Sequence, residues 1–304
     1  MSILQGIGPV FAIILLGCWL SRIGFPSREF WPASDKVAYY VMFPALLIDS
    51  LGKADFSAVP VSAMAGAIYL TMAASLAVWY VVRRSLDLPG PAFTSVFQGV
   101  LRCNTFVALS AVLALYGQQG LAVAGVLLMC MIPVVNMLCV AVLNRYGAAD
   151  GGRGPSAVAR ELVRNPLILG CAAGLALNLL HLDLPLGVGG TFSVLGRAAL
   201  PVGLLAVGSA LRFGNLFGQL RPLIVSSIMK LALMPLAAFA FCWLLGIPHL
   251  ARSVMVLLCA CPLAASAYIL ARQMGGDHEL AASLITAQTL LSALTLPLVA
   301  WALL

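Results

Sequence analysis

Two polar clusters interrupt long apolar stretches of the sequence, and both contain residue types that begin or end helices. The first cluster is Arg102, Asn104 and Thr105, midway along the run SVFQGVLRCNTFVALSAVLALYG. The second contains Pro262, midway along the run SVMVLLCACPLAASAYILARQMG. Asn and Thr cap helix N-termini with a side-chain oxygen, and proline lacks the N–H that a continuous helix needs. We therefore predict that each run is a broken helix whose second half starts near its centre.

A pair of such breaks is typical of an anion site. A helix N-terminus presents unpaired backbone N–H groups and a partial positive charge, and Arg102 adds a full charge beside one of them. If the two breaks meet, the pocket between them favours a negatively charged ligand. The alternative is that Pro262 only kinks a continuous helix and that Arg102 reaches the interface or pairs with a carbonyl group.

Other polar residues in apolar segments are weaker candidates for the same pocket. They flank the second break or lie at similar depth in neighbouring segments: Cys261, Ser266, Tyr268, Asn136, Gln288, Thr289 and Ser292. Interhelical hydrogen bonding is the alternative for Asn136 and for the three residues between 288 and 292. Lys230 precedes Pro235 by about one turn, and we assign it a role in supporting the broken helix, balancing a substrate charge or coupling transport.

The composition of the chain is that of an integral membrane protein. Of its 304 residues, 62% are hydrophobic and 9% are charged, and the mean hydropathy is +1.05. Soluble domains contain about a quarter charged residues, so a water-soluble fold is excluded. The 17 basic residues are dispersed in short loops, which argues against nucleic acid as a partner.

Known catalytic and metal-binding patterns are missing from the sequence. The eight cysteines fall in apolar stretches without the spacing of metal sites or disulfide frameworks. The sequence contains neither HExxH nor GxSxG. We therefore expect no enzyme activity, no metal and no cofactor, and we leave open whether H⁺ or Na⁺ is a coupling ion.

Apolar runs and their punctuation predict ten transmembrane helices. They span residues 3–21, 36–52, 60–82, 92–116, 120–145, 164–181, 191–212, 222–245, 251–274 and 279–303. With both termini outside, the inner loops carry twelve basic residues and the outer loops carry only Lys53 and Arg252. The positive-inside rule favours that orientation. The three remaining cations, Arg102, Arg197 and Lys230, lie within predicted helices.

The two halves of the chain resemble each other at a nearly constant offset. Three short matches, one in each of three successive helix pairs, recur at shifts of 157–159 residues. We therefore predict a first five-helix repeat at 1–146, a polar cytoplasmic linker at 147–159 and a second repeat at 160–304. Because five is odd, the second repeat is inverted in the membrane, as in many alternating-access transporters.

At the level of motifs, the chain resembles the auxin efflux carrier family, in particular its short bacterial malate or malonate permeases. The resemblance lies in LRCNTF at 101–106, LPVGLLAVGSAL at 200–211, the segment from Lys230 to Pro235, and TLLSALTLP at 289–297. The fold of this family is similar to that of PIN-type auxin carriers and bile acid:sodium symporters.

This resemblance implies a scaffold of helices 1, 2, 6 and 7, a transport domain of helices 3–5 and 8–10, and a homodimer formed through the scaffold. Helices 4 and 9 would cross at the substrate, near Asn104 and Pro262. The expected function is transport of a small organic anion, such as malate, malonate or an auxin-like acid, across the bacterial inner membrane. A membrane-embedded sensor without flux and a sodium-coupled symporter of the bile acid type are the alternatives.

Overall fold

The computed structural model describes all residues except 1–2, 57–58, 149–159, 161–162, 183 and 215–218. Every element in the described part of the chain is helical. The first half contains α1 (Ile3–Arg22), α2 (Phe30–Val37), α3 (Phe43–Gly52), α4 (Val61–Val82), α5 (Gly90–Leu101) and α6 (Thr105–Tyr146). The second contains α8 (Pro166–Leu179), α9 (Leu186–Ser209), α10 (Leu220–Ile228), α11 (Met234–Leu244), α12 (His249–Ala260), α13 (Ser266–Met274) and α14 (His278–Leu303).

Several of these helices are suited to a membrane. Six helical stretches in the described residues are long and apolar enough to cross a bilayer. Large apolar side chains also remain exposed on the outside of the bundle: Val81 is 71% exposed, Leu294 71% and Trp301 77%. Such an apolar exterior is expected when lipid, rather than water, surrounds the helices.

Two prolines explain two widened turns. The π-helical segment Ala38–Met42 joins α2 to α3 just before Pro44, and the π-helical segment Met229–Leu233 joins α10 to α11 just before Pro235. Proline cannot donate to the carbonyl four residues earlier and its ring clashes with it, so a widened turn at that carbonyl relieves the conflict. The helical stretch that consists of α2, this π-helical segment and α3 begins at Phe30, earlier than the predicted start of the second helix at residue 36.

The predicted fourth and fifth helices meet inside α6. Gly117 has φ 63° and ψ −156°, which interrupts the helical path between them. Glycine is favoured at a position with positive φ because it has no Cβ that would clash with the backbone. The prediction placed the gap between these two helices at the same point.

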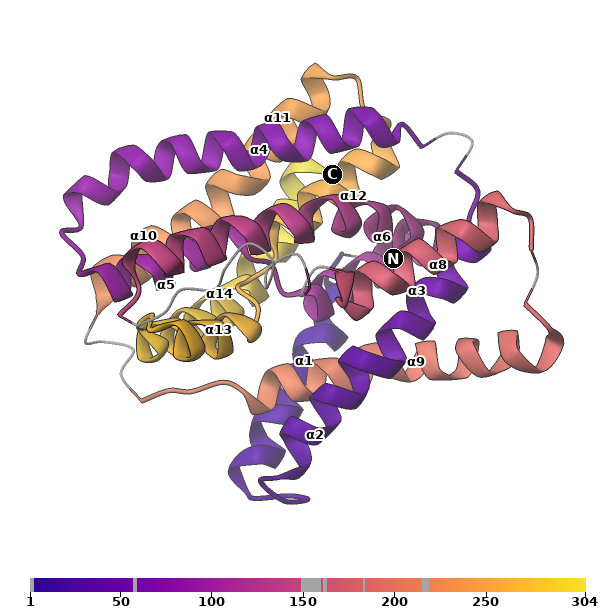
Figure 1. Ribbon diagram of the computed structural model, residues 1–304, viewed down its shortest axis with the longest axis horizontal. Coiled ribbons are helices and arrows are strands. Elements are labelled where there is room, and N and C mark those ends of the chain that lie inside the picture. Colours follow the sequence, from indigo (N-terminus) through magenta and orange to yellow (C-terminus); the bar gives the residue numbers. More distant parts are fainter. Residues whose placement is uncertain (1–2, 57–58, 149–159, 161–162, 183, 215–218) are drawn as a thin grey trace.

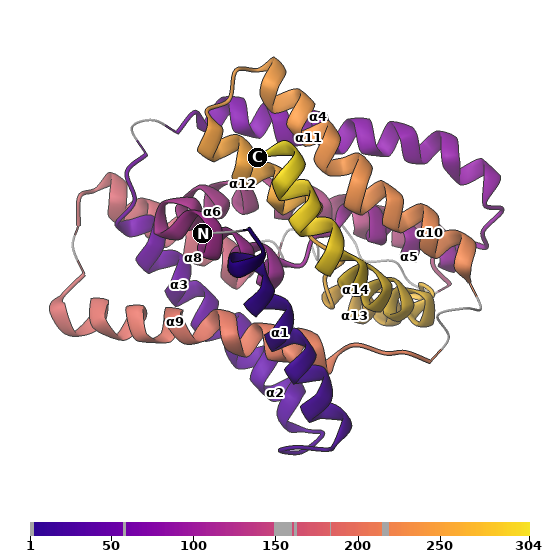
Figure 2. The ribbon, with the colours of Figure 1, turned by 180° about the vertical axis from the view of Figure 1, so that it is seen from behind.

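Two groups of helices lie apart from each other in both ribbon views (Figures 1 and 2). One group contains α1, α2, α3 and α9, and the other contains α4, α5, α10, α11 and α12. In the first group, α1 and α9 approach closely at small residues: a Cβ on Gly208 would lie 1.9 Å from the Ile14 carbonyl oxygen, and one on Gly17 would lie 2.2 Å from that of Leu205. Of the predicted linker 147–159, residues 149–159 lie outside the described residues.

Candidate functional site

Both predicted breaks occur as interruptions in the helices. α5 ends at Leu101, Arg102 is extended (φ −74°, ψ 137°), and α6 starts at Thr105. Asn104 caps α6, because its Oδ1 accepts hydrogen bonds from the backbone N–H groups of Phe106 (3.1 Å) and Val107 (3.3 Å). The sequence therefore specifies the first restart through a capping side chain.

The second break follows the same plan with a different residue. α12 ends at Ala260, Cys261 is extended (φ −73°, ψ 147°), and α13 starts at Ser266. Pro262 has no N–H to donate to the preceding turn, which explains why α12 ends here. The simple kink that the sequence left open does not occur at Pro262.

Direct hydrogen bonds join the two breaks. The Asn104 backbone N–H donates to the Pro262 carbonyl oxygen at 2.7 Å. Gln288 of α14 reinforces this junction: its Oε1 accepts from the Leu263 N–H at 2.9 Å, and its Nε2 donates to the Gly99 carbonyl oxygen at 3.1 Å. The breaks are therefore held in contact by backbone and side-chain bonds together.

A cavity of about 380 Å³ lies beside this junction, and we call it the central cavity. A smaller pocket of about 80 Å³ shares several of its walls. The polar and charged residues that line the central cavity come from α2, the adjoining π-helical segment, the first break, α6, α13 and the start of α8: Asp35, Lys36, Tyr39, Tyr40, Arg102, Asn104, Thr105, Asn136, Asn165, Ser266 and Gln273. Its volume is in the range of small-molecule sites.

Two hydrogen-bond donors at the central cavity have no partner in the described residues. Arg102 donates from Nη2 to the Ser266 hydroxyl at 3.2 Å, but its buried Nη1 has no acceptor. The Nδ2 amide of Asn104, a residue that is 1% exposed, also lacks one. An unsatisfied buried donor costs about 1–3 kcal/mol. Because both nitrogens are buried, a ligand in the cavity would satisfy them only after these side chains turn toward it.

The structure separates the predicted site residues into three sets. Arg102, Asn104, Thr105, Asn136 and Ser266 line the central cavity. Cys261 and Pro262 are buried within the second break, and Tyr268 faces an adjoining chamber described below. Gln288, Thr289 and Ser292 are buried in α14, where Thr289 and Ser292 donate to carbonyl oxygens of their own helix.

Lys230 lies in the core of the second helix group. It is 0% exposed within the π-helical segment Met229–Leu233, and its Nζ donates to the thioether sulfur of Met234 at 3.3 Å. Arg197, another cation within a predicted helix, is exposed on α9 and donates to the Ser193 hydroxyl at 3.2 Å and carbonyl oxygen at 3.4 Å. Arg102 is therefore the one of these three cations that lines the central cavity.

The sequence analysis did not select six of the polar residues that line this cavity: Asp35, Lys36, Tyr39, Tyr40, Asn165 and Gln273. Asn165 caps α8 through hydrogen bonds from the N–H groups of Leu167 and Ile168, a role that the dipeptide Asn165-Pro166 signals. Asp35, Lys36 and Tyr39 lie near the start of the second predicted helix. Asp35, the one carboxylate that the described residues contribute to this cavity, had no signal that distinguished it from a helix-end residue.

The adjoining chamber has a volume of about 320 Å³. It shares Asp35, Phe106, Ala265 and Ile269 with the central cavity. A further cavity of about 570 Å³ lies near the other end of the molecule, between α3, α8 and α9.

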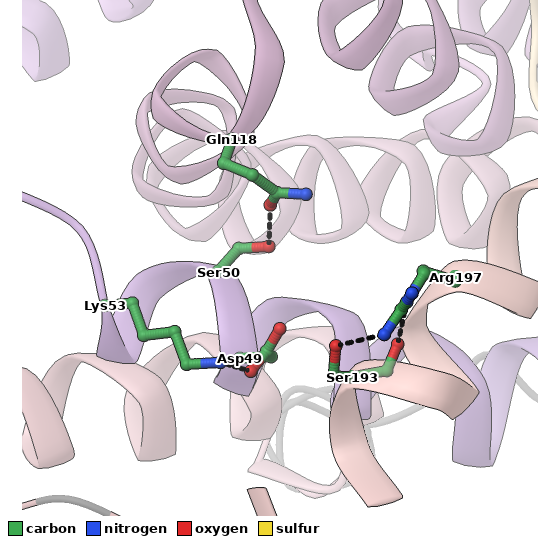
Figure 3. A network of polar contacts seen from close by, with 6 residues as sticks. All are labelled: Asp49, Ser50, Lys53, Gln118, Ser193 and Arg197. Carbon is green, nitrogen blue, oxygen red and sulfur yellow. Dashed lines mark hydrogen bonds and ion pairs between the residues drawn. The ribbon is translucent and has the colours of Figure 1, made fainter. Parts of the chain in front are cut away.

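The 570 Å³ cavity between α3, α8 and α9 differs from the central cavity in the charge of its wall. Figure 3 shows the polar contacts near it: Lys53 forms an ion pair with Asp49, and Ser50 donates to Gln118 of α6 at 3.2 Å. Asp49 and Lys53 are the charged residues of its wall, and they neutralise each other. The excess positive charge is thus found at the central cavity and its adjoining chamber.

Comparison with known proteins places the chain among transporters. Residues 155–300 match the model of a family described as "Membrane transport protein". A protein of Methanothermobacter thermautotrophicus named "Uncharacterized transporter" is 27% identical over 298 residues, which cover 95% of this chain and 94% of that protein. A protein of Rhizobium meliloti named "Putative malonate transporter" is 26% identical over 309 residues, which cover 94% of this chain and 91% of that protein. These matches confirm the resemblance drawn from the sequence motifs: the chain is similar to a family of membrane transport proteins over residues 155–300 and, over most of its length, to two proteins named as transporters.

Proposed function

We propose that this protein carries a small organic anion across the bacterial inner membrane by alternating access, with the substrate in the central cavity. The observation that carries the proposal is the cavity bounded by the two helix breaks, whose wall contains Arg102 and Asn104, each with a buried donor that has no partner in the described residues. A carboxylate accepts several charge-assisted hydrogen bonds and would satisfy both donors once the two side chains turn toward the cavity. The name of the malonate-transporter relative supports a carboxylate such as malate or malonate, and an auxin-like acid fits the same chemistry.

The electrostatics of the wall support an anion over a cation. Among the described residues, two cations, Lys36 and Arg102, line the central cavity with a single carboxylate, Asp35. The N-terminus of α6 begins at the same wall and adds its partial positive charge. In a region of low dielectric these charges attract an anion more strongly than they would in water.

The proposed architecture follows the sequence prediction. Ten transmembrane helices form two inverted five-helix repeats, 1–146 and 160–304, which cross at the breaks of the fourth and ninth helices. Helices 1, 2, 6 and 7 form a scaffold that pairs with a second copy, and helices 3–5 and 8–10 move as the transport domain. Both termini lie outside. The bonds between the breaks support a moving unit that keeps its binding site intact.

Uptake by proteoliposomes tests the proposal. Labelled malonate, malate and acetate would be offered to the wild type, Arg102→Gln and Asn104→Ala, with Arg272→Gln as the control because Arg272 is exposed and lies outside the central cavity. We expect saturable uptake of at least one acid by the wild type and the control, and a loss of about tenfold or more in each site variant, as expected when a charge-assisted bond is removed. Equal uptake by all four proteins would overturn the site.

The same assay separates the two alternative functions. A membrane-embedded sensor would bind the acid with saturation but show no flux. A sodium-coupled symporter would require a sodium gradient for accumulation. Uptake that persists without sodium and responds to an imposed pH gradient would identify H⁺ as the coupling ion.

A further inference from the structure

Arginines and aromatic rings alternate where α4, α5 and α6 reach one end of the bundle. Arg83 and Arg84 follow α4 directly, Phe93 lies in the first turn of α5, and Tyr146 ends α6. A Cβ on Gly90 would lie 2.4 Å from the Tyr146 carbonyl oxygen, so the start of α5 and the end of α6 are in close contact. We call this cluster the arginine–aromatic strip, and its members are Tyr80, Arg83, Arg84, Phe93, Arg145 and Tyr146.

Each arginine of the strip lies against an aromatic ring. The guanidinium carbon of Arg83 is 4.3 Å from the centre of the Tyr80 ring, and that of Arg84 is 5.4 Å from the same centre. The guanidinium carbon of Arg145 is 5.9 Å from the centre of the Tyr146 ring. A guanidinium that stacks on a ring keeps its edge N–H groups available, in the fork geometry that suits a phosphate group.

The rings hold this arrangement in place. Phe93 stacks on Trp79, which is 2% exposed, with the ring centres 5.6 Å apart, and meets Tyr146 edge-to-face at 4.9 Å. The guanidinium carbon of Arg83 also lies 5.7 Å from the centre of the Phe93 ring. Because the strip is anchored to a buried side chain, less conformational entropy is lost when its arginines bind a ligand.

The positive charge of the strip is not neutralised by the carboxylates that the structure describes. Among those residues, no carboxylate oxygen lies within 4.0 Å of a side-chain nitrogen of Arg83, Arg84 or Arg145. Asp87, the acidic residue closest to Arg84 in the chain, is exposed in the following loop and forms no such pair. Three guanidinium groups are therefore available to an anion.

The strip lies at the end of a predicted membrane span, where lipid headgroups are expected. The stretch Val61–Ser85 is long and apolar enough to cross a bilayer, and it ends at the two adjacent arginines. Near the same end of α4, Val81 is 71% exposed and Tyr80 is 53% exposed. Exposed valine is suited to contact with acyl chains, and tyrosine is enriched at the membrane interface. An anion bound here would thus lie beside an apolar, lipid-facing surface.

From these observations we infer that the arginine–aromatic strip binds the phosphate group of an anionic phospholipid. Arg83 and Arg84 bind the phosphate, and the Tyr80 ring positions both guanidinium groups. Val81 contacts an acyl chain, and Arg145 adds positive charge at the edge of the site. A zwitterionic lipid has the same phosphate but also a cation, which the arginines repel. This binding does not depend on the proposed transport function.

Native mass spectrometry of the purified full chain in detergent tests the inference, with dioleoylphosphatidylglycerol and dioleoylphosphatidylcholine as probes. We expect the anionic lipid to bind about tenfold more tightly than the zwitterionic one, and its Kd to rise about tenfold or more in Arg83→Gln/Arg84→Gln. Tyr80→Leu keeps both charges and removes the ring, so the Kd should rise about threefold. Arg197→Gln/Arg252→Gln removes the same charge outside the strip and should bind as the wild type does.

Three results would overturn the lipid site. The first is equal affinity of the wild type for the two lipids, and the second is an unchanged Kd for the anionic lipid in Arg83→Gln/Arg84→Gln. The third is an equal loss in Arg197→Gln/Arg252→Gln, which would mean that net charge alone attracts the lipid. Displacement of the lipid by an equal concentration of inorganic phosphate would identify a site for soluble phosphate and would also reject the lipid. Binding with the expected pattern, in a protein without anion flux, would support the lipid site and reject the transport proposal.

Discussion

The backbone N–H of Asn104 donates to the carbonyl oxygen of Pro262 at 2.7 Å, so the residue that starts one half-helix is bonded directly to the break in the other. The side chain of Asn104 meanwhile caps α6 with its oxygen and leaves its amide nitrogen without a partner in the described residues. One residue thus connects the breaks, starts a helix and keeps a donor for a ligand. The two side-chain roles are separable by substitution, and the backbone bond is kept in the variants below.

Asn104→Ala should remove both the cap and the free donor, whereas Asn104→Ser keeps a capping oxygen and loses the amide. We expect the alanine variant to be destabilised by about 1 kcal/mol and the serine variant by less. Both should lose anion uptake to a similar extent, because neither has the amide donor. Thermal unfolding in detergent and proteoliposome uptake measure the two effects.

Asp277→Ala provides a matched control for the cap. Asp277 caps α14 by accepting from the Leu280 N–H at 2.9 Å, and it lies outside the central cavity. The Asp277→Ala substitution should lower the free energy of unfolding by about as much as Asn104→Ala does, without a selective loss of uptake. If Asn104→Ser transported as well as the wild type, the amide nitrogen would have no part in binding.

Gln288→Leu should destabilise the junction between the breaks. The amide is 0% exposed, and its loss removes the acceptor of the Leu263 N–H and the donors to Gly99 and Ser226. A buried group left without its partner costs about 1–3 kcal/mol, and we expect a loss of that size in the free energy of unfolding.

The neighbouring Thr289→Val is the control for this substitution. Thr289 is 1% exposed, and its hydroxyl donates to the Ile285 carbonyl oxygen within the same helix. The Ile285 carbonyl oxygen is also a hydrogen-bond acceptor within the helix, so the free energy of unfolding should fall by less than about 1 kcal/mol. Equal losses in both variants would mean that the bonds of Gln288 add nothing to the junction.

The two breaks could be predicted from the sequence because local chemistry determines them. A capping Asn and a Pro in the middle of apolar runs act within one helical turn, so no knowledge of the fold is required. The pairing of the breaks followed from the repeat. The bonds of Gln288 could not be predicted in this way, since a glutamine that faces a cavity and one that joins three helices have the same sequence pattern.

The full wall of the central cavity also depends on tertiary packing. Tyr39, Asn165 and Ser266 come from segments far apart in the chain and meet only in the folded bundle. Asp35 was passed over because it directly precedes the predicted helix 36–52, a position that resembles that of an ordinary interfacial carboxylate. Lys230 was predicted as an intramembrane cation, but its thioether acceptor could be identified only from the structure.

Gly208→Ala should disrupt the contact between α1 and α9. A Cβ at this position would lie 1.9 Å from the carbonyl oxygen of Ile14, a backbone atom that cannot turn aside. We expect a loss of about 1–3 kcal/mol, the usual cost of overpacking, measured by unfolding in detergent.

Gly66→Ala in α4 is the matched control, because among the described residues no heavy atom beyond the neighbouring backbone of its own helix lies within 4 Å of the point that an added Cβ would occupy. Alanine is favoured over glycine inside a helix by about 0.5–1 kcal/mol, so this variant should be as stable as the wild type or more so. A destabilised Gly66→Ala with an unaffected Gly208→Ala would contradict the close approach of α1 and α9.

Lys230→Met should separate stability from transport. Lys230 is 0% exposed, its acceptor is the Met234 thioether, and no carboxylate lies within ion-pair distance of its Nζ in the described residues. Burying a charge without an anionic partner is costly, and methionine fills a similar volume without that cost. We therefore expect Lys230→Met to unfold at the same or a higher temperature than the wild type.

If the charge of Lys230 attracts the substrate anion to the transport domain, the same variant should transport more slowly, and Lys230→Arg should retain more activity than Lys230→Met. A variant that unfolds at a lower temperature and transports at the wild-type rate would show that Lys230 serves packing alone.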